Sequence, residues 1–97
     1  MNYWLHPKAG EDLQEAADFY RRQAGAALSQ SFLTEFERSV GLLLQYPRLG
    51  VIWRHGKRRL VTRRFPFSLI YTVVGDQIRI LAVAHHSRHP DYWHSRM

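Results

Sequence analysis

In the first half of the chain, apolar residues recur every three to four positions, which is the spacing of an amphipathic helix. They do so in two stretches, from Lys8 to about Ala24 and from about Ala27 to Tyr46. Gly25 separates the stretches, and Pro47 ends the second because the residue before a proline avoids helical backbone. The pattern therefore predicts two helices joined by a turn.

The second half of the chain favours strands, because β-branched and aromatic residues suit a pleated sheet. Predicted strands cover residues 3–5, 59–65, 67–74 and 77–85. Between the last two, Gly75-Asp76 predicts a hairpin turn with a positive φ at the glycine. The last strand is apolar on both faces from Ile80 to Ala84, as expected of a central strand. The tail from Ser87 carries Tyr92 and Trp93 and is expected to fold back and dock.

This order of elements, β-α-α-β-β-β, is typical of an α+β fold. We expect a helical hairpin packed on one face of a curved antiparallel sheet, within one domain over residues 1–97. The chain has no cysteine, which excludes a disulfide scaffold and a cysteine nucleophile. It shows no signal-peptide pattern and no apolar run near the roughly 20 residues that span a bilayer. A cytoplasmic location is therefore expected.

The formal charge of +6 is unevenly distributed. Residues 1–47 hold four basic and six acidic side chains, whereas residues 48–97 hold ten basic and two acidic ones. Five of the six histidines also lie in the second half. A basic surface of this kind attracts phosphates or an acidic protein.

The stretch 57–64 has five basic residues in eight, namely Lys57, Arg58, Arg59, Arg63 and Arg64. Period-two alternation places Arg59 and Arg63 on one face of a strand, with Arg58 and Arg64 on the other. One interpretation is a groove that binds phosphate or carboxylate on the open sheet face. The alternative is a charged edge strand that prevents pairing between sheets. The density of charge favours the groove.

A second cluster follows the last strand, with His85, His86, Arg88 and His89 close in sequence. Imidazoles at a strand end suit acid–base chemistry. They equally suit a structural role in pinning the tail. Adjacent strand residues point to opposite faces, so His85 and His86 do not chelate a metal together, and no metal is expected. No elbow motif surrounds a serine such as Ser68, which argues against a serine triad.

Several segments resemble the RelE/ParE family, the toxins of bacterial type II toxin–antitoxin modules. They are the first helix with Ala16 and Tyr20, residues 43–50 (LLQYPRLG), residues 64–71 (RFPFSLIY) and residues 80–93 (ILAVAHHSRHPDYW). The resemblance implies the fold predicted above, no cofactor, and a cognate antitoxin whose acidic, partly disordered segment wraps the toxin. It also implies a role in growth arrest or plasmid stabilisation.

The family divides by mechanism. RelE-like members cut mRNA on the ribosome without metal, and that resemblance implies catalytic roles for Arg59, Arg63, His85, His86 and Arg88. ParE-like members poison DNA gyrase and are not enzymes. The nucleases commonly carry an arginine in the third strand where Ser68 stands here, and the Phe-Pro-Phe stretch looks more like ParE-type members.

We therefore expect a gyrase-directed toxin that an antitoxin neutralises. The alternatives are a ribosome-dependent mRNA endoribonuclease and an inactive module that binds nucleic acid or protein. The expected binding residues are basic or aromatic side chains of the second half: Lys57, Arg58, Arg59, Arg63, Arg64, Arg88, Tyr92 and Trp93.

Overall fold

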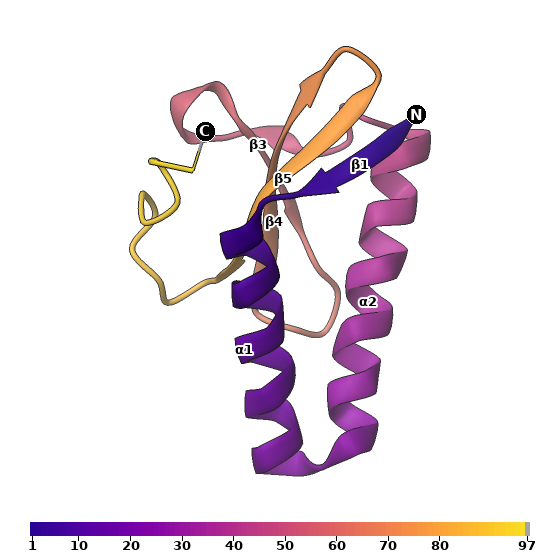
Figure 1. Ribbon diagram of the computed structural model, residues 1–97, viewed down its shortest axis with the longest axis vertical. Helices are drawn as coiled ribbons and strands as arrows, with labels where there is room; N and C mark the ends of the chain where they lie inside the picture. The colour runs from indigo at the N-terminus through magenta and orange to yellow at the C-terminus, as the bar shows by residue number, and fades with distance from the viewer. Residues whose placement is uncertain (97) are drawn as a thin grey trace.

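A computed structural model describes residues 1–96 and confirms the α+β fold (Figure 1). Two long helices lie side by side against one face of a five-stranded sheet. The elements are β1 (Asn2–Leu5), α1 (Pro7–Ala24), α2 (Ala26–Gln45), β2 (Val51–Ile52), η1 (Arg54–Gly56), β3 (Arg58–Val61), β4 (Phe67–Val74) and β5 (Gln77–His85). The sheet order is β1-β5-β4-β3-β2. None of the helices in the described residues is both long and apolar enough to span a membrane.

The sheet differs from the prediction at both of its edges, β1 and β2. β1 runs parallel to β5, with Asn2 opposite Gln77, so the sheet is mixed; its other pairs are antiparallel. These strands are far apart in the chain, and alternation within a strand carries no information about its direction. The strand β2 was not predicted, because two residues are too few to show a period.

The strand β3 ends at Val61, and the prediction that it continues to Phe65 is wrong. The Thr62 hydroxyl lies 3.0 Å from both the Phe65 and the Phe67 carbonyl oxygens and closes a tight loop. Within that loop Arg64 adopts a left-handed φ of 69°. After Val61 the chain therefore turns back toward β4 instead of continuing as a paired strand.

The helix side of the sheet holds a large core with many aromatic rings. Tyr20 and Phe32 of the helices contact Phe65 and Phe67, with ring centroids 5.0–6.3 Å apart. Such edge-on and tilted contacts add to the burial of apolar area.

Tyr71, on the same side of the sheet, fixes the connection that leads from α2 to β2. Its hydroxyl donates to the Pro47 carbonyl and accepts the Gly50 N–H. A Cβ at position 50 would lie 2.7 Å from the Tyr71 ring, so this close approach requires glycine.

The opposite side of the sheet holds a second, smaller core. Trp93, only 1% exposed, packs there with Ile70, Leu81 and Ala82. Ile70 pairs with Ala82 and the next residue of β4 pairs with Ile80, so Leu81 is an extra residue, a β-bulge. The bulge turns both Leu81 and Ala82 toward the tail. Ile80 and Val83 face the helices, so this strand is apolar on both faces because both are covered.

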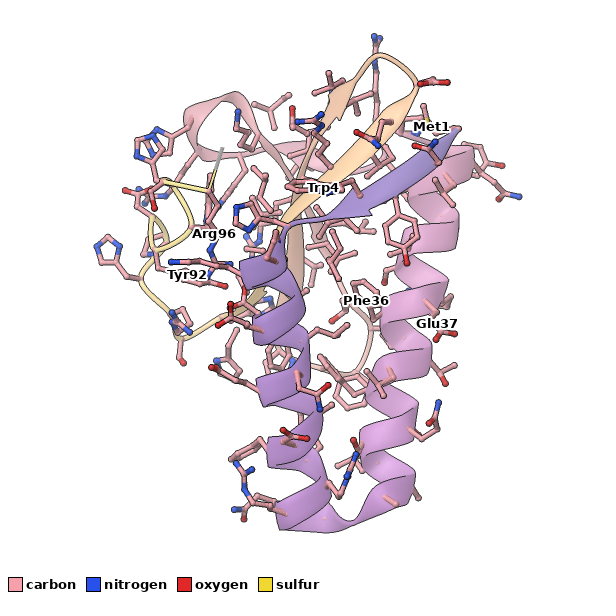
Figure 2. All side chains as sticks on the ribbon, in the orientation of Figure 1. Met1, Trp4, Phe36, Glu37, Tyr92 and Arg96 are labelled. Atoms are coloured by element: carbon pink, nitrogen blue, oxygen red, sulfur yellow. The ribbon has the colours of Figure 1, made fainter. Side chains whose placement is uncertain are left out.

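The tail is fastened to α1 by the carboxylate of Asp12. Figure 2 shows Tyr92 and Arg96 beside the first turns of this helix. Arg96 Nη1 lies 2.6 Å and the Tyr92 hydroxyl 3.0 Å from Asp12 Oδ2, which also accepts the Val83 N–H. Burial, and then the nearby Asp12 charge, raise the pKa of Tyr92, so this hydroxyl stays a donor. The predicted docking of the tail is confirmed through residue 96; Met97 lies outside the described residues.

Candidate functional site

A small pocket of about 70 Å³ opens on the tail side of the sheet, beside the second core. Trp53 and Arg59 border it on one side, and Ser68 lies in its floor. The segment that follows β5 supplies the other wall with His86 and Arg88. Residues that are far apart in the sequence therefore meet at one place.

Arg59 enters the pocket because alternation along β3 turns it away from the helices. Its Nε donates to the Ser68 hydroxyl oxygen at 3.0 Å. The guanidinium carbon lies 4.5 Å from the centroid of the Trp53 ring, a cation–π contact. The side chain is thus held by two partners before any ligand arrives.

Ser68 also bonds to His86, whose Nε2 lies 2.9 Å from the hydroxyl oxygen. The strand register brings them together, since Ser68 pairs with Ala84 and the His86 N–H donates to the Pro66 carbonyl. Burial, and then the Arg59 charge, lower the pKa of His86, which favours the neutral ring near pH 7. The serine oxygen can accept two hydrogen bonds, so the tautomer of the ring decides whether Ser68 or His86 donates in this pair.

This Ser68–His86 pair was not predicted from the sequence. The two residues lie in no motif and are 18 positions apart, so only the pairing of β4 with β5 reveals them. The signal that was available is that Ser68 shares a sheet face with Arg59.

Two comparisons with known proteins agree on the family of this chain. A family model described as the "ParE toxin of type II toxin-antitoxin system, parDE" matches residues 3–90. The chain belongs to the ParE toxin family. A solved structure described as "Chromosomal ParDE TA system from P. aeruginosa" has a TM-score of 0.80 and 27% identity to this ParE-type toxin. That match covers 88% of this chain and 95% of the other. No curated protein sequence matches.

Of the residues expected to act in a nuclease, the structure brings some together and not others. Arg59, His86 and Arg88 line the pocket, as does His85, although its ring packs against Phe67 on the helix side at 5.0 Å. The two histidines thus point to opposite faces, as predicted. Arg63 does not share a face with Arg59, because it lies in the loop after β3, where its N–H donates to Glu35.

The expected binding residues are also dispersed in this ParE-type toxin. Arg58 faces the helix side and donates to the Arg48 and Gly50 carbonyls. Lys57 precedes β3, and Arg64 lies over the Phe65 ring in the following loop.

The tail residues differ from one another. Both Tyr92 and Trp93 line the pocket, but only Trp93 is a fully buried member of the second core; the Arg88 guanidinium carbon lies 3.9 Å from the Tyr92 ring centroid. The functional roles of all these residues stay predictions.

A second polar cluster pins the tail near η1. Asp91 Oδ1 lies 3.0 Å from His55 Nε2, and Arg54 Nη1 lies 3.4 Å from Oδ2. The hydrogen bond from His55 is the main reason why the pKa of Asp91 is lowered. The His55 ring stacks on His94 with centroids 3.7 Å apart. Within residues 1–96, no three His, Asp or Glu side chains are grouped in a way that would hold a metal ion.

Proposed function

We propose that this ParE-type toxin acts on DNA gyrase, and that an acidic cognate antitoxin neutralises it. Membership of the ParE family, over residues 3–90, is the observation that carries the proposal. The site supports it as well. Ser68, rather than an arginine, faces the pocket from β4, so the pocket has one phosphate-binding guanidinium fewer than the resemblance implies for a nuclease.

The tail gives a second reason to favour gyrase over mRNA. Trp93 and its neighbours cover part of the sheet face that carries Arg59, which leaves less of that face open to a strand of RNA. The pocket that remains beside them is small, about 70 Å³. Ribonuclease activity keeps one point in its favour, because His86 and Ser68 are hydrogen-bonded beside Arg59.

The experiment compares both targets with one protein preparation. Purified toxin is added to gyrase and relaxed plasmid, and separately to translating ribosomes with a defined mRNA. We expect loss of supercoiling and accumulation of cleaved DNA–gyrase complex, with intact mRNA. Premixing with antitoxin should abolish the effect. Metal-independent mRNA cuts that disappear in His86→Ala, with supercoiling unaffected, would refute the proposal.

The outer edge of β2 is the surface that we propose for the antitoxin. Val51 and Ile52 are each 63% exposed, and β2 is the edge strand of the sheet, where a further strand can be added. The side chains around it are basic, including Arg48, Arg54 and Arg58. An acidic segment with alternating apolar residues complements this edge, and ordering it on binding is typical of coupled folding.

The two sheet edges provide a matched test of the antitoxin surface. Ile52→Asp places a negative charge on the β2 edge, where it repels an acidic segment. Tyr3→Asp does the same on the opposite edge, at β1, where Tyr3 is 44% exposed. We expect antitoxin affinity to fall about tenfold or more for Ile52→Asp only, measured by calorimetry. Equal losses in both variants would contradict the choice of edge.

A further inference from the structure

The tail covers only part of its side of the sheet, and the end near the hairpin of β4 and β5 stays open. The residues of the sheet that the tail covers are centred on Ile70, Leu81 and Ala82. Beyond them, the strand register sets six side chains in two rows across β1, β5 and β4: Trp4, Arg79 and Thr72, then Asn2, Gln77 and Val74. We call these six residues the open patch. None of them is fully buried, and none lines the pocket at Ser68.

The open patch faces away from the helices, as the burial of its neighbours shows. Ile78 and Ile80 flank Arg79 in β5 and are completely buried in the helix-side core. Alternation therefore turns Arg79 to the other side of the sheet, and Trp4, its partner in β1, turns the same way. Figure 2 shows Trp4 toward the end of the molecule that carries the hairpin, away from the turn between α1 and α2.

Trp4 is the aromatic ring of the open patch. The Arg79 guanidinium carbon lies 5.4 Å from its ring centroid, and the His6 ring meets it edge-on with centroids 5.5 Å apart. The side chain is nevertheless 39% exposed, so much of the indole is in contact with water. An aromatic ring held on a sheet and left open to solvent is a surface on which an unpaired base can stack.

The charge of the open patch suits an anionic partner. Arg79 Nε donates to Gln77 Oε1 at 3.0 Å, which helps to hold the guanidinium beside Trp4. Within residues 1–96, Arg79 forms no ion pair. None of the six residues is acidic, and Asp76 lies in the turn before β5. A cation beside a stacking ring matches the alternation of base and phosphate along a nucleic acid strand.

We propose that the open patch binds single-stranded DNA, with an unpaired base stacked on Trp4 and a neighbouring phosphate against Arg79. Bases in a duplex already stack on one another, so the strand has to be unpaired. The choice of DNA over RNA rests on the proposed action on gyrase, an enzyme that works on DNA. The stacking itself does not depend on that target, because it is measured with the toxin alone.

The first test measures binding of a labelled oligothymidylate by fluorescence anisotropy. Trp4→Leu should weaken binding about tenfold, the usual size of the loss when one base–aromatic stack is removed. Trp4→Phe keeps a ring and should retain most of the affinity. Phe19→Leu is the matched control, because Phe19 is a 50% exposed aromatic side chain on α1, outside the open patch. Equal weakening by Trp4→Leu and Phe19→Leu would refute the site.

The second test concerns the phosphate contact, and it carries the proposal if Trp4→Leu does not fold. For Arg79→Gln, the logarithm of the binding constant should fall less steeply with the logarithm of the salt concentration, by about 0.7 in slope for one lost contact to a single strand. Arg21→Gln removes an equal charge at the exposed end of α1 and should keep the parental slope. The same change of slope in both variants would overturn the contact, since net charge alone would then explain it.

The third test compares strands. A basic surface without stacking prefers duplex DNA, which carries more charge per unit length, whereas stacking on Trp4 favours the single strand. Duplex binding as tight as that of oligothymidylate would overturn the proposal, and tighter binding of oligouridylate would overturn the choice of DNA. A toxin that inhibits gyrase but does not bind the oligonucleotide would refute this proposal alone. A toxin that binds the oligonucleotide without inhibiting gyrase would support the open patch and refute the proposed function.

Discussion

The two faces of the sheet are covered in different ways. On the helix side, two long helices bury a core of aromatic and branched aliphatic side chains. On the other side, a short tail covers only part of the sheet, with a core built around one tryptophan. Polar bonds to Asp12 and Asp91 complete that attachment. The comparison teaches that the helix side provides the fold, whereas the tail side provides the place where charged side chains meet.

The largest difference between the faces should come from Phe32→Ala. Phe32 is 1% exposed and contacts rings from β4 and the preceding loop, so its truncation leaves a large cavity. We expect a loss of about 3–5 kcal/mol in the free energy of unfolding, measured by urea denaturation. The helices and the sheet should unfold together. Trp93→Ala is the comparison on the other face, and hydrogen exchange should show protection lost first in the tail. Simultaneous loss throughout the chain would mean that the faces are not separable.

An intermediate effect is expected for Asp12→Ala. The side chains of Asp12 and Arg96 are 8% and 9% exposed, so removing the acid leaves a buried, unpaired guanidinium. That should cost about 3 kcal/mol in the free energy of unfolding. Replacing both residues by leucine should restore most of it, because no charge is then buried. Asp18→Ala on the same helix is the control, with a change below about 0.5 kcal/mol. A loss in the double variant equal to that of Asp12→Ala would argue against a charge effect.

The smallest effect concerns pH. The pKa of His86 is lowered in the folded protein, so the unfolded chain binds the proton more readily. The contribution of neutral His86 to the free energy of unfolding is therefore fully present above the ordinary imidazole pKa of about 6.5. It declines as the pH falls below that value. Urea midpoints measured on both sides of this value should differ less in His86→Gln than in the parent protein. If His86→Gln keeps the parental difference between the midpoints, the pH effect belongs to another group.

The sequence predicted the locally determined parts of the fold well. Both helices and the hairpin of β4 and β5 end within about one residue of their predicted limits, and Gly75 has the expected positive φ of 60°. The spacing of apolar residues, proline and glycine decides these features within a short stretch of chain. The direction of β1 and the existence of β2 depend on partners elsewhere, and no local pattern reports them.

The candidate site was predicted in composition but not in arrangement. Arg59, His86 and Arg88 were expected together, and they do line one pocket. Arg63 was expected with them because β3 was predicted to continue past it, but β3 ends at Val61. The hydrogen bonds of Thr62 that end that strand depend on how the following loop folds. Ser68 was missed as a partner because its role depends on the register between β4 and β5.

The bulge at Leu81 has a consequence for the insertions and deletions that this strand can tolerate. Without Leu81, Ile80 and Val83 would still alternate with Ala82, and the helix side would keep its register. The tail would lose the one large side chain that β5 offers to it. A single inserted residue thus lets a strand that contributes large side chains to the helix-side core contribute one to the tail-side core as well. An insertion or a deletion at this point can add or remove the apolar contact between β5 and the tail while the rest of the fold is unchanged.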